Sequence, residues 1–66
     1  MQLINDVAAA RKARGWTQEA LAERVGVTRR TIISLEKGHY TPSLTLGLMI
    51  ATALQVPVAD LFRLEE

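Results

Sequence analysis

The sequence contains no cysteine and a single histidine, His39. Without cysteine there is no disulfide framework, no thiolate nucleophile and no zinc site of the cysteine type. One histidine also excludes a multi-histidine metal site, so we expect no metal and no cofactor. No glycine-rich phosphate loop and no Ser–His–Asp set can be assigned, and we therefore expect that the chain is not an enzyme.

Long hydrophobic runs are absent as well. The longest apolar stretch, Leu44–Leu54, is interrupted by Thr45, Gly47 and Thr52, and it is far shorter than the ~20 residues that span a bilayer. Residues 1–6 contain no basic leader before an apolar run, so we expect no secretory signal, no membrane partner and a cytoplasmic location. With 66 residues, 48% of them hydrophobic and 23% charged, the chain is predicted to be one globular domain, residues 1–66.

Charge is distributed unevenly along the chain, although the formal net charge is only +1. Residues 1–40 hold seven of the eight Lys and Arg residues and four of the seven acids, whereas residues 41–66 hold one base, Arg63, and three acids. Such an asymmetry favours a surface that faces a polyanion, but it also occurs on ordinary solvated surfaces.

Apolar residues recur at helical spacing, and glycine and proline separate the repeats. Five helices are predicted, over residues 2–14, 18–24, 29–37, 44–54 and 57–62. Thr17, Thr28 and Ser43 are suitable N-caps, and Gly15 and Gly38 are suitable helix ends. We therefore predict an all-α fold, in which residues 63–66 form either a frayed tail or one short strand.

Residues 17–37 have the layout of a helix-turn-helix, in which two short helices flank Val25-Gly26-Val27. Gly26 can adopt a positive φ at no steric cost, and the small Ala22 lets the two helices cross closely. The second helix then turns one face outward, made of Thr28, Arg29, Arg30, Ile33, Ser34 and Lys37, three of which are basic.

The motifs Thr17-Gln18-Glu19-x-Leu21-Ala22 and Ile32-x-x-Leu35-Glu36-x-Gly38 resemble the Cro/CI-type (XRE-like) helix-turn-helix family of bacterial and phage transcription regulators. The likeness continues through Pro42-Ser43-Leu44 and Asp60-Leu61-Phe62, and so covers nearly the whole chain. It implies a five-helix, lambda-repressor-like DNA-binding domain. The length is similar to that of minimal repressors that lack a sensor domain.

The resemblance also implies roles for individual residues. The base-reading positions of the recognition helix correspond to Arg29, Arg30, Thr31 and Ser34. The positions that bind DNA phosphates correspond to Gln18, Thr28, Lys37, His39, Tyr40 and Thr41. Arg11 and Glu36 correspond to a partly buried, structural salt bridge. An arginine fork matches O6 and N7 of guanine, but which of the two arginines reads a base is left open.

Simpler interpretations exist for several of these residues. Arg29 and Arg30 could belong to a solvated helix face, and His39 could simply be solvent-exposed. Tyr40 could stack on the sugar–phosphate backbone or cover its own loop. Trp16 is predicted to be a core residue that bridges the first two helices. Met49 is either an accidental exposure or part of an interface.

Self-association is expected because one recognition helix reads only a half-site, and dimers read two half-sites about 34 Å apart. The segment Phe62–Glu66 alternates apolar and polar residues, as a short strand does. We expect that this strand has no partner within the chain and pairs with its own copy. The predicted homodimer interface consists of Val58, Leu61, Phe62 and Leu64.

Together these observations predict a sequence-specific regulator of transcription that binds double-stranded DNA, with no small-molecule ligand. Repression by occupying a palindromic operator is the expected mode of action, since no activation or ligand domain fits in the chain. The alternative is an antitoxin or another protein-interaction module of a two-component pair that uses the same fold.

Overall fold

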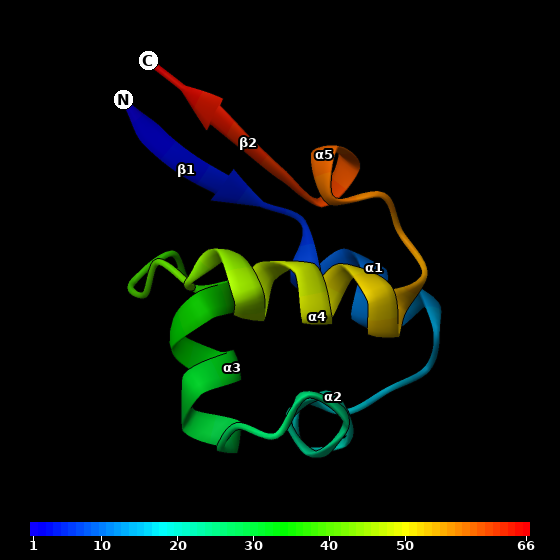
Figure 1. Ribbon diagram of the computed structural model, residues 1–66. Coiled ribbons are helices and arrows are strands. Elements are labelled where there is room, and N and C mark those ends of the chain that lie inside the picture. Colours follow the sequence, from blue (N-terminus) through cyan, green and yellow to red (C-terminus); the bar gives the residue numbers. More distant parts are fainter.

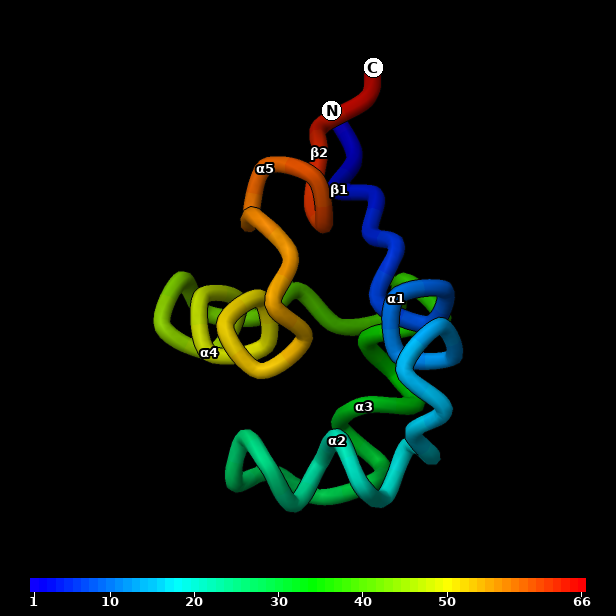
Figure 2. The backbone as a smooth tube through the Cα atoms, turned by 90° about the vertical axis from the view of Figure 1, so that its right-hand side faces the viewer, coloured from blue at the N-terminus to red at the C-terminus, as the bar shows by residue number.

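The computed structural model describes residues 1–66, which form five helices and a two-stranded sheet that projects from one side of the helices. The elements in chain order are β1 (Gln2–Asn5), α1 (Val7–Ala13), α2 (Gln18–Val25), α3 (Arg29–Glu36), α4 (Leu44–Leu54), α5 (Val58–Leu61) and β2 (Phe62–Glu65). Figures 1 and 2 show α1 and α4 on opposite sides of the molecule, α2 and α3 below them, and the sheet above. Both termini lie at the outer tip of the sheet.

The apolar core lies between the helices and collects residues from all five. Its largest fully buried side chains are Val7, Leu21, Ile32, Leu35, Ile50, Leu54 and Leu61. Ala22 is also fully buried, so the small residue predicted at the crossing of the two helices occupies that place. Because α3 turns Ile32 and Leu35 inward, its other side is left to solvent.

Three helices begin at side-chain caps that the sequence predicts. The hydroxyls of Thr17, Thr28 and Ser43 accept hydrogen bonds from the backbone N–H three residues later, at 3.0, 3.3 and 3.1 Å respectively. Each bond satisfies one of the amides that a helix start leaves free. Gly26 has φ +74° at the turn between α2 and α3, where a side chain would be strained.

The predicted helix over residues 2–14 is wrong at its start, because residues 2–5 form β1 and the helix begins at Val7. Hydrogen bonds of the Asn5 side chain hold the chain at the junction between β1 and α1. Its Oδ1 accepts a hydrogen bond from the N–H of Val7 at 3.1 Å, and its Nδ2 donates to the carbonyl of Leu35 at 3.0 Å. The local signal was present in Asn5 and Asp6, residue types that favour helix starts, but the spacing of Leu3 and Val7 also fits a helix.

The expectation that the C-terminal strand has no partner within the chain is also wrong. β2 pairs with β1 in an antiparallel register that places Leu3 opposite Leu64 and Asn5 opposite Phe62. The N–H of Asp6 then donates to the carbonyl of Leu61 at 2.9 Å and continues the ladder to α5. Leu61, predicted at a dimer interface, is 1% exposed and belongs to the core.

The other predicted helices agree with the structure to within one residue at each end. α4 has the predicted bounds, and α2 and α3 differ only in their last residue. α5 is one residue shorter at each end, because Pro57 is its N-cap and Phe62 begins β2. No helix is long and apolar enough to cross a membrane.

Candidate nucleic-acid interface

The outward side of α3 presents two free guanidinium groups. Arg29 and Arg30, in the first turn of α3, are both exposed, and neither forms an ion pair within the chain. Two cations without an internal partner can neutralise phosphates or donate hydrogen bonds to base edges. An α-helix of this kind fits the major groove of B-DNA.

The hydroxyls of Thr28 and Thr31 lie beside these arginines and contact each other, with 3.1 Å between the two oxygen atoms. The N–H of Thr31 also donates to Oγ1 of Thr28, the N-cap of the helix. Thr31 and Ser34 are half-buried, and Thr28 is exposed. The four predicted base-reading residues therefore lie on one helix, two of them exposed and two half-buried.

The other end of α3 holds an ion pair in the predicted place. The guanidinium of Arg11 in α1 donates to the carboxylate of Glu36 through Nε at 2.7 Å and through Nη2 at 3.1 Å. Both side chains are less than one tenth exposed. Nη1 of Arg11 donates to the carbonyl of Trp16 at 2.7 Å, so this one side chain joins α1, α3 and the segment before α2.

These contacts keep both groups charged. Burial by itself raises the pKa of Glu36, but hydrogen bonds from Arg11 and Gln18 and the charge of Arg11 lower it below its ordinary value. The hydrogen bond to Glu36 raises the pKa of Arg11, against the opposing effect of burial. The pair is therefore an ionised, buried connection between helices.

Gln18, the predicted phosphate ligand, is the first residue of α2 and meets this pair. Its Nε2 donates to Oε1 of Glu36 at 3.0 Å. The side chain is half-buried, so part of the amide stays open to solvent. Gln18 consequently lies at the C-terminal end of α3, about 10 Å along the helix from Arg29 and Arg30 at its start.

The loop after α3 lies at the same end of that helix. Lys37, His39, Tyr40 and Thr41 are all exposed, and Tyr40 retains 42% of its accessible surface. The loop turns at Gly38, whose φ is +79°, and the N–H of His39 donates to the carbonyl of Ser34. The predicted phosphate ligands thus gather at this end of α3, except for Thr28 at its start.

Trp16 differs in part from its predicted role as a core residue. Its ring is half-buried against the core, and the guanidinium of Arg24 lies over it, 4.0 Å from the ring centroid. Arg14 lies 5.4 Å from the same centroid. Sequence reasoning did not find these cation–π contacts, because the three residues come together only once α1 and α2 are in place.

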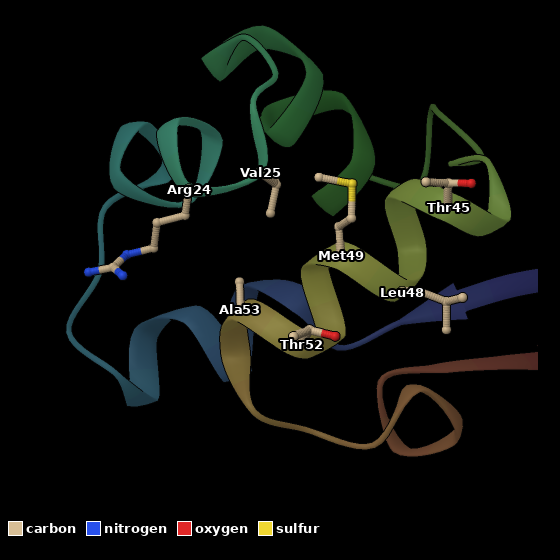
Figure 3. Close-up of a pocket in the computed structure, with 7 residues that line it drawn as sticks. All are labelled: Arg24, Val25, Thr45, Leu48, Met49, Thr52 and Ala53. Carbon is tan, nitrogen blue, oxygen red and sulfur yellow. The ribbon is translucent and has the colours of Figure 1, made fainter.

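Met49 lies in an open, mostly apolar groove between the end of α2 and α4. The groove has a volume of about 480 Å³ and is lined by Arg24, Val25, Thr45, Leu48, Met49, Thr52 and Ala53. Figure 3 shows Met49 reaching from α4 toward the α2–α3 side, and Arg24 pointing away from the groove. Met49 is 45% exposed, so an interface role stays a prediction.

Known proteins share this arrangement. Residues 7–61 match the model of the HTH_3 family, described as helix-turn-helix. An uncharacterized HTH-type transcriptional regulator from Methanothermobacter thermautotrophicus is 61% identical over 57 residues, which cover 85% of this chain and 83% of the relative. The uncharacterized HTH-type transcriptional regulator YgzD of Bacillus subtilis is 48% identical over 62 residues, 94% of each chain.

A solved structure and a more distant relative extend the comparison. The restriction-modification controller protein C.AhdI of Aeromonas hydrophila superposes with a TM-score of 0.77 at 33% identity, over 82% of this chain and 78% of that one. The antitoxin HipB of Escherichia coli is 34% identical over 55 residues, which cover 83% of this chain and 58% of HipB.

Proposed function

Because the chain belongs to the HTH_3 family of XRE-type helix-turn-helix DNA-binding regulators, we propose that it is a repressor that binds a palindromic operator as a homodimer. In this proposal α3 enters the major groove of double-stranded DNA. Repression then needs no further activity, because a protein seated on an operator that overlaps a promoter excludes RNA polymerase. Residues 1–66 serve as one DNA-binding domain.

The observation that carries the proposal is the pair of free guanidinium groups of Arg29 and Arg30 on the open side of α3. Gln18 and the exposed side chains of residues 37–41 stand at the other end of the helix. If the start of α3 contacts bases and its other end contacts phosphates, the phosphate contacts fix the position and orientation of the helix in the major groove. Thr31 and Ser34 would complete the reading surface.

Dimerisation through a revised surface is part of the proposal. The exposed apolar side chains near β2 are Leu44, Leu48, Val58 and Leu64, with 77, 45, 37 and 64% of their surface accessible. Leu44 and Val58 line one hollow together with Leu3, Pro42, Ser43, Gly47 and Phe62. Val58 and Leu64 are exposed and stay in the proposed interface, whereas buried Leu61 is left out of it.

The position of this surface supports a two-fold arrangement on DNA. Leu44 begins α4 directly after the loop at residues 39–42, which we place on the phosphate backbone. Two copies joined near that loop would present both α3 helices on the same side of a duplex, as dimers with half-sites about 34 Å apart require.

The DNA-binding proposal is tested by selecting bound duplexes from a random pool and measuring affinities for the selected sequence. Arg29→Ala and Arg30→Ala should each weaken binding by about 1–3 kcal/mol, or roughly ten- to hundredfold. Lys12→Ala is the charge-matched control, since it removes an exposed cation of α1 to which no DNA contact is assigned. Wild-type affinity in both arginine variants would overturn the role of α3.

The dimer is tested separately by sedimentation equilibrium at tens of micromolar. We expect a dimer for the wild type and a monomer for Leu44→Glu combined with Val58→Glu, since two carboxylates in an apolar contact must be desolvated. The selected duplexes should also be palindromic. A monomeric wild type would refute the dimer and leave the DNA-binding proposal standing.

An antitoxin is the second candidate, and the similarity to HipB favours it. Such a protein neutralises a toxin partner and binds DNA with the same fold. A stable one-to-one complex with the product of an adjoining gene, which relieves that product's toxicity, would support this function. Growth that is unaffected by loss of the chain would count against it.

A further inference from the structure

One buried carboxylate, that of Glu36, receives hydrogen bonds from two other helices. Arg11 of α1 donates twice to it, at 2.7 and 3.1 Å, and Gln18 of α2 donates through Nε2 at 3.0 Å. Glu36 is itself the last residue of α3. The Glu36 side chain is 7% exposed, so little water competes with the donors for this carboxylate.

An ionised carboxylate accepts hydrogen bonds and donates none. The Gln18 amide can therefore meet Glu36 only with its nitrogen, and this fixes which end of the amide points inward. One N–H of Nε2 is used by Glu36, and the other N–H remains for an external acceptor. An amide in the opposite orientation would place its carbonyl oxygen against the carboxylate.

The surroundings of Gln18 suit an anion as that acceptor. Gln18 opens α2, where the first backbone N–H groups have no partner within the helix. The cap at Thr17 satisfies only the N–H of Ala20 by its side chain. The remaining N–H of Nε2 and the amides of the first turn would then donate to the same acceptor.

We propose that Glu36 is a positioning residue for DNA binding: it orients the Gln18 amide so that its second N–H faces a backbone phosphate, and it ties this phosphate contact to the end of α3. This inference rests on the proposed function, in which Gln18 binds a phosphate. Arg11 holds Glu36 in its ionised form and so keeps the amide from turning over. The carboxylate of Glu36 thereby fixes the position of the phosphate contact relative to α3.

A double-mutant cycle tests the proposal, with the folded fraction of each variant measured by circular dichroism and each affinity expressed per folded molecule. Glu36→Gln keeps the shape of the side chain but can accept or donate, so it no longer dictates the orientation of Gln18. Affinity for the selected duplex is measured for the wild type, Glu36→Gln, Gln18→Ala and the double variant. Gln18→Ala should weaken binding by about tenfold, as expected for the loss of a hydrogen bond to a charged group.

The proposal requires strong coupling between the two positions. Glu36→Gln should weaken binding several-fold in the wild-type background and have no further effect when Gln18 is already alanine. In a Thr41→Ala background, where another predicted phosphate contact is lost, the effect of Glu36→Gln should persist. An equal loss in the presence and absence of Gln18 would mean a merely structural role and overturn the proposal.

Side-chain NMR of the ¹⁵N-labelled wild type tests the same point without any substitution. One Gln18 amide proton should shift as Glu36 is protonated at low pH, and the other should shift when the selected duplex is added. Tight binding of the duplex with both protons unmoved would refute the positioning role alone. Absence of duplex binding would instead refute the proposed function.

Discussion

Removal of Arg11 from the buried pair gives the sharpest test of what holds the helices together. In Arg11→Met the carboxylate of Glu36 loses two of its three hydrogen bonds and its only contacting cation, and the carbonyl of Trp16 loses the bond from Nη1. Breaking one side of a buried ion pair costs about 3–5 kcal/mol. A chain of this size derives about 3–5 kcal/mol from its core, so the variant should be largely unfolded at 25 °C.

The double variant Arg11→Met/Glu36→Met should regain most of that stability. Replacing both members of a buried pair by apolar side chains is often neutral, so we expect an unfolding free energy within about 1–2 kcal/mol of the wild type. The residual loss reflects the Trp16 carbonyl, for which one hydrogen bond is worth about 1 kcal/mol. Gln18 is half-buried and can bond to water instead.

Urea unfolding, followed by circular dichroism and by fluorescence of the single tryptophan, measures these differences at one fixed protein concentration. Lys12→Met is the charge-matched control, because it removes an exposed cation that acts on Glu36 through its charge and forms no hydrogen bond with it, and it should change stability by about 0.5 kcal/mol or less. An Arg11→Met variant that loses under 1 kcal/mol would refute the reasoning. So would a double variant that is no more stable than the single one.

Four further predictions concern backbone conformation and the charge of Glu36. Gly47→Ala should stabilise the protein by about 0.5–1 kcal/mol, or roughly 2–8 °C in Tm, because Gly47 lies inside α4 and an added Cβ meets only a ring carbon of Phe62 at 3.7 Å. Gly26→Ala, at φ +74°, should destabilise the protein by about 1–2 kcal/mol, and calorimetry compares the two variants. Gln55 has φ +57°, so Gln55→Gly should stabilise by about 0.5–1 kcal/mol, and a lower Tm would contradict this. Because the native pKa of Glu36 is lowered, its charge stabilises the fold at pH values above its ordinary pKa of about 4.3. This stabilisation is lost as the pH falls through the native pKa. In an acid titration, the unfolding free energy of Glu36→Gln should therefore fall less steeply with decreasing pH than that of the wild type.

The helix-turn-helix could be predicted from the sequence because its signals are local. Thr17 and Thr28 cap helices through bonds to residues three positions away, and Gly26 marks the turn by a backbone conformation that few other residues adopt. Such features depend on neighbours in the chain and need no knowledge of the remaining fold. The starts of α2 and α3 followed from them, as the start of α4 followed from its cap Ser43.

The terminal sheet could not be predicted in the same way, because each strand is only four residues long. Residues 2–5 show no alternation that excludes a helix, and their partner lies at the opposite end of the sequence. Only β2 carried a pattern of its own. Because β1 was not predicted, the apolar residues at the C-terminal end had no partner within the chain and were interpreted as a dimer interface. Leu61 was assigned to that interface instead of to the core.

The candidate site was predictable in its members but not in their connections. The resemblance supplied Gln18, Arg11 and Glu36 as separate assignments, one on DNA and two in a salt bridge. The structure joins them in one hydrogen-bonded group. That junction depends on how three helices cross, which no spacing along the chain encodes.

The pairing of β1 with β2 brings consequences for how the chain folds. Its two strands come from the ends of the polypeptide, and the ion pair beside them joins residues 57 positions apart, Asp6 and Arg63. Closing so long a loop from a disordered chain costs roughly 3–4 kcal/mol of entropy, whereas the helices and their tight turns form from near neighbours. We therefore expect β1 and β2 to pair last, after the helices have packed, and to separate first when the molecule is pulled or warmed.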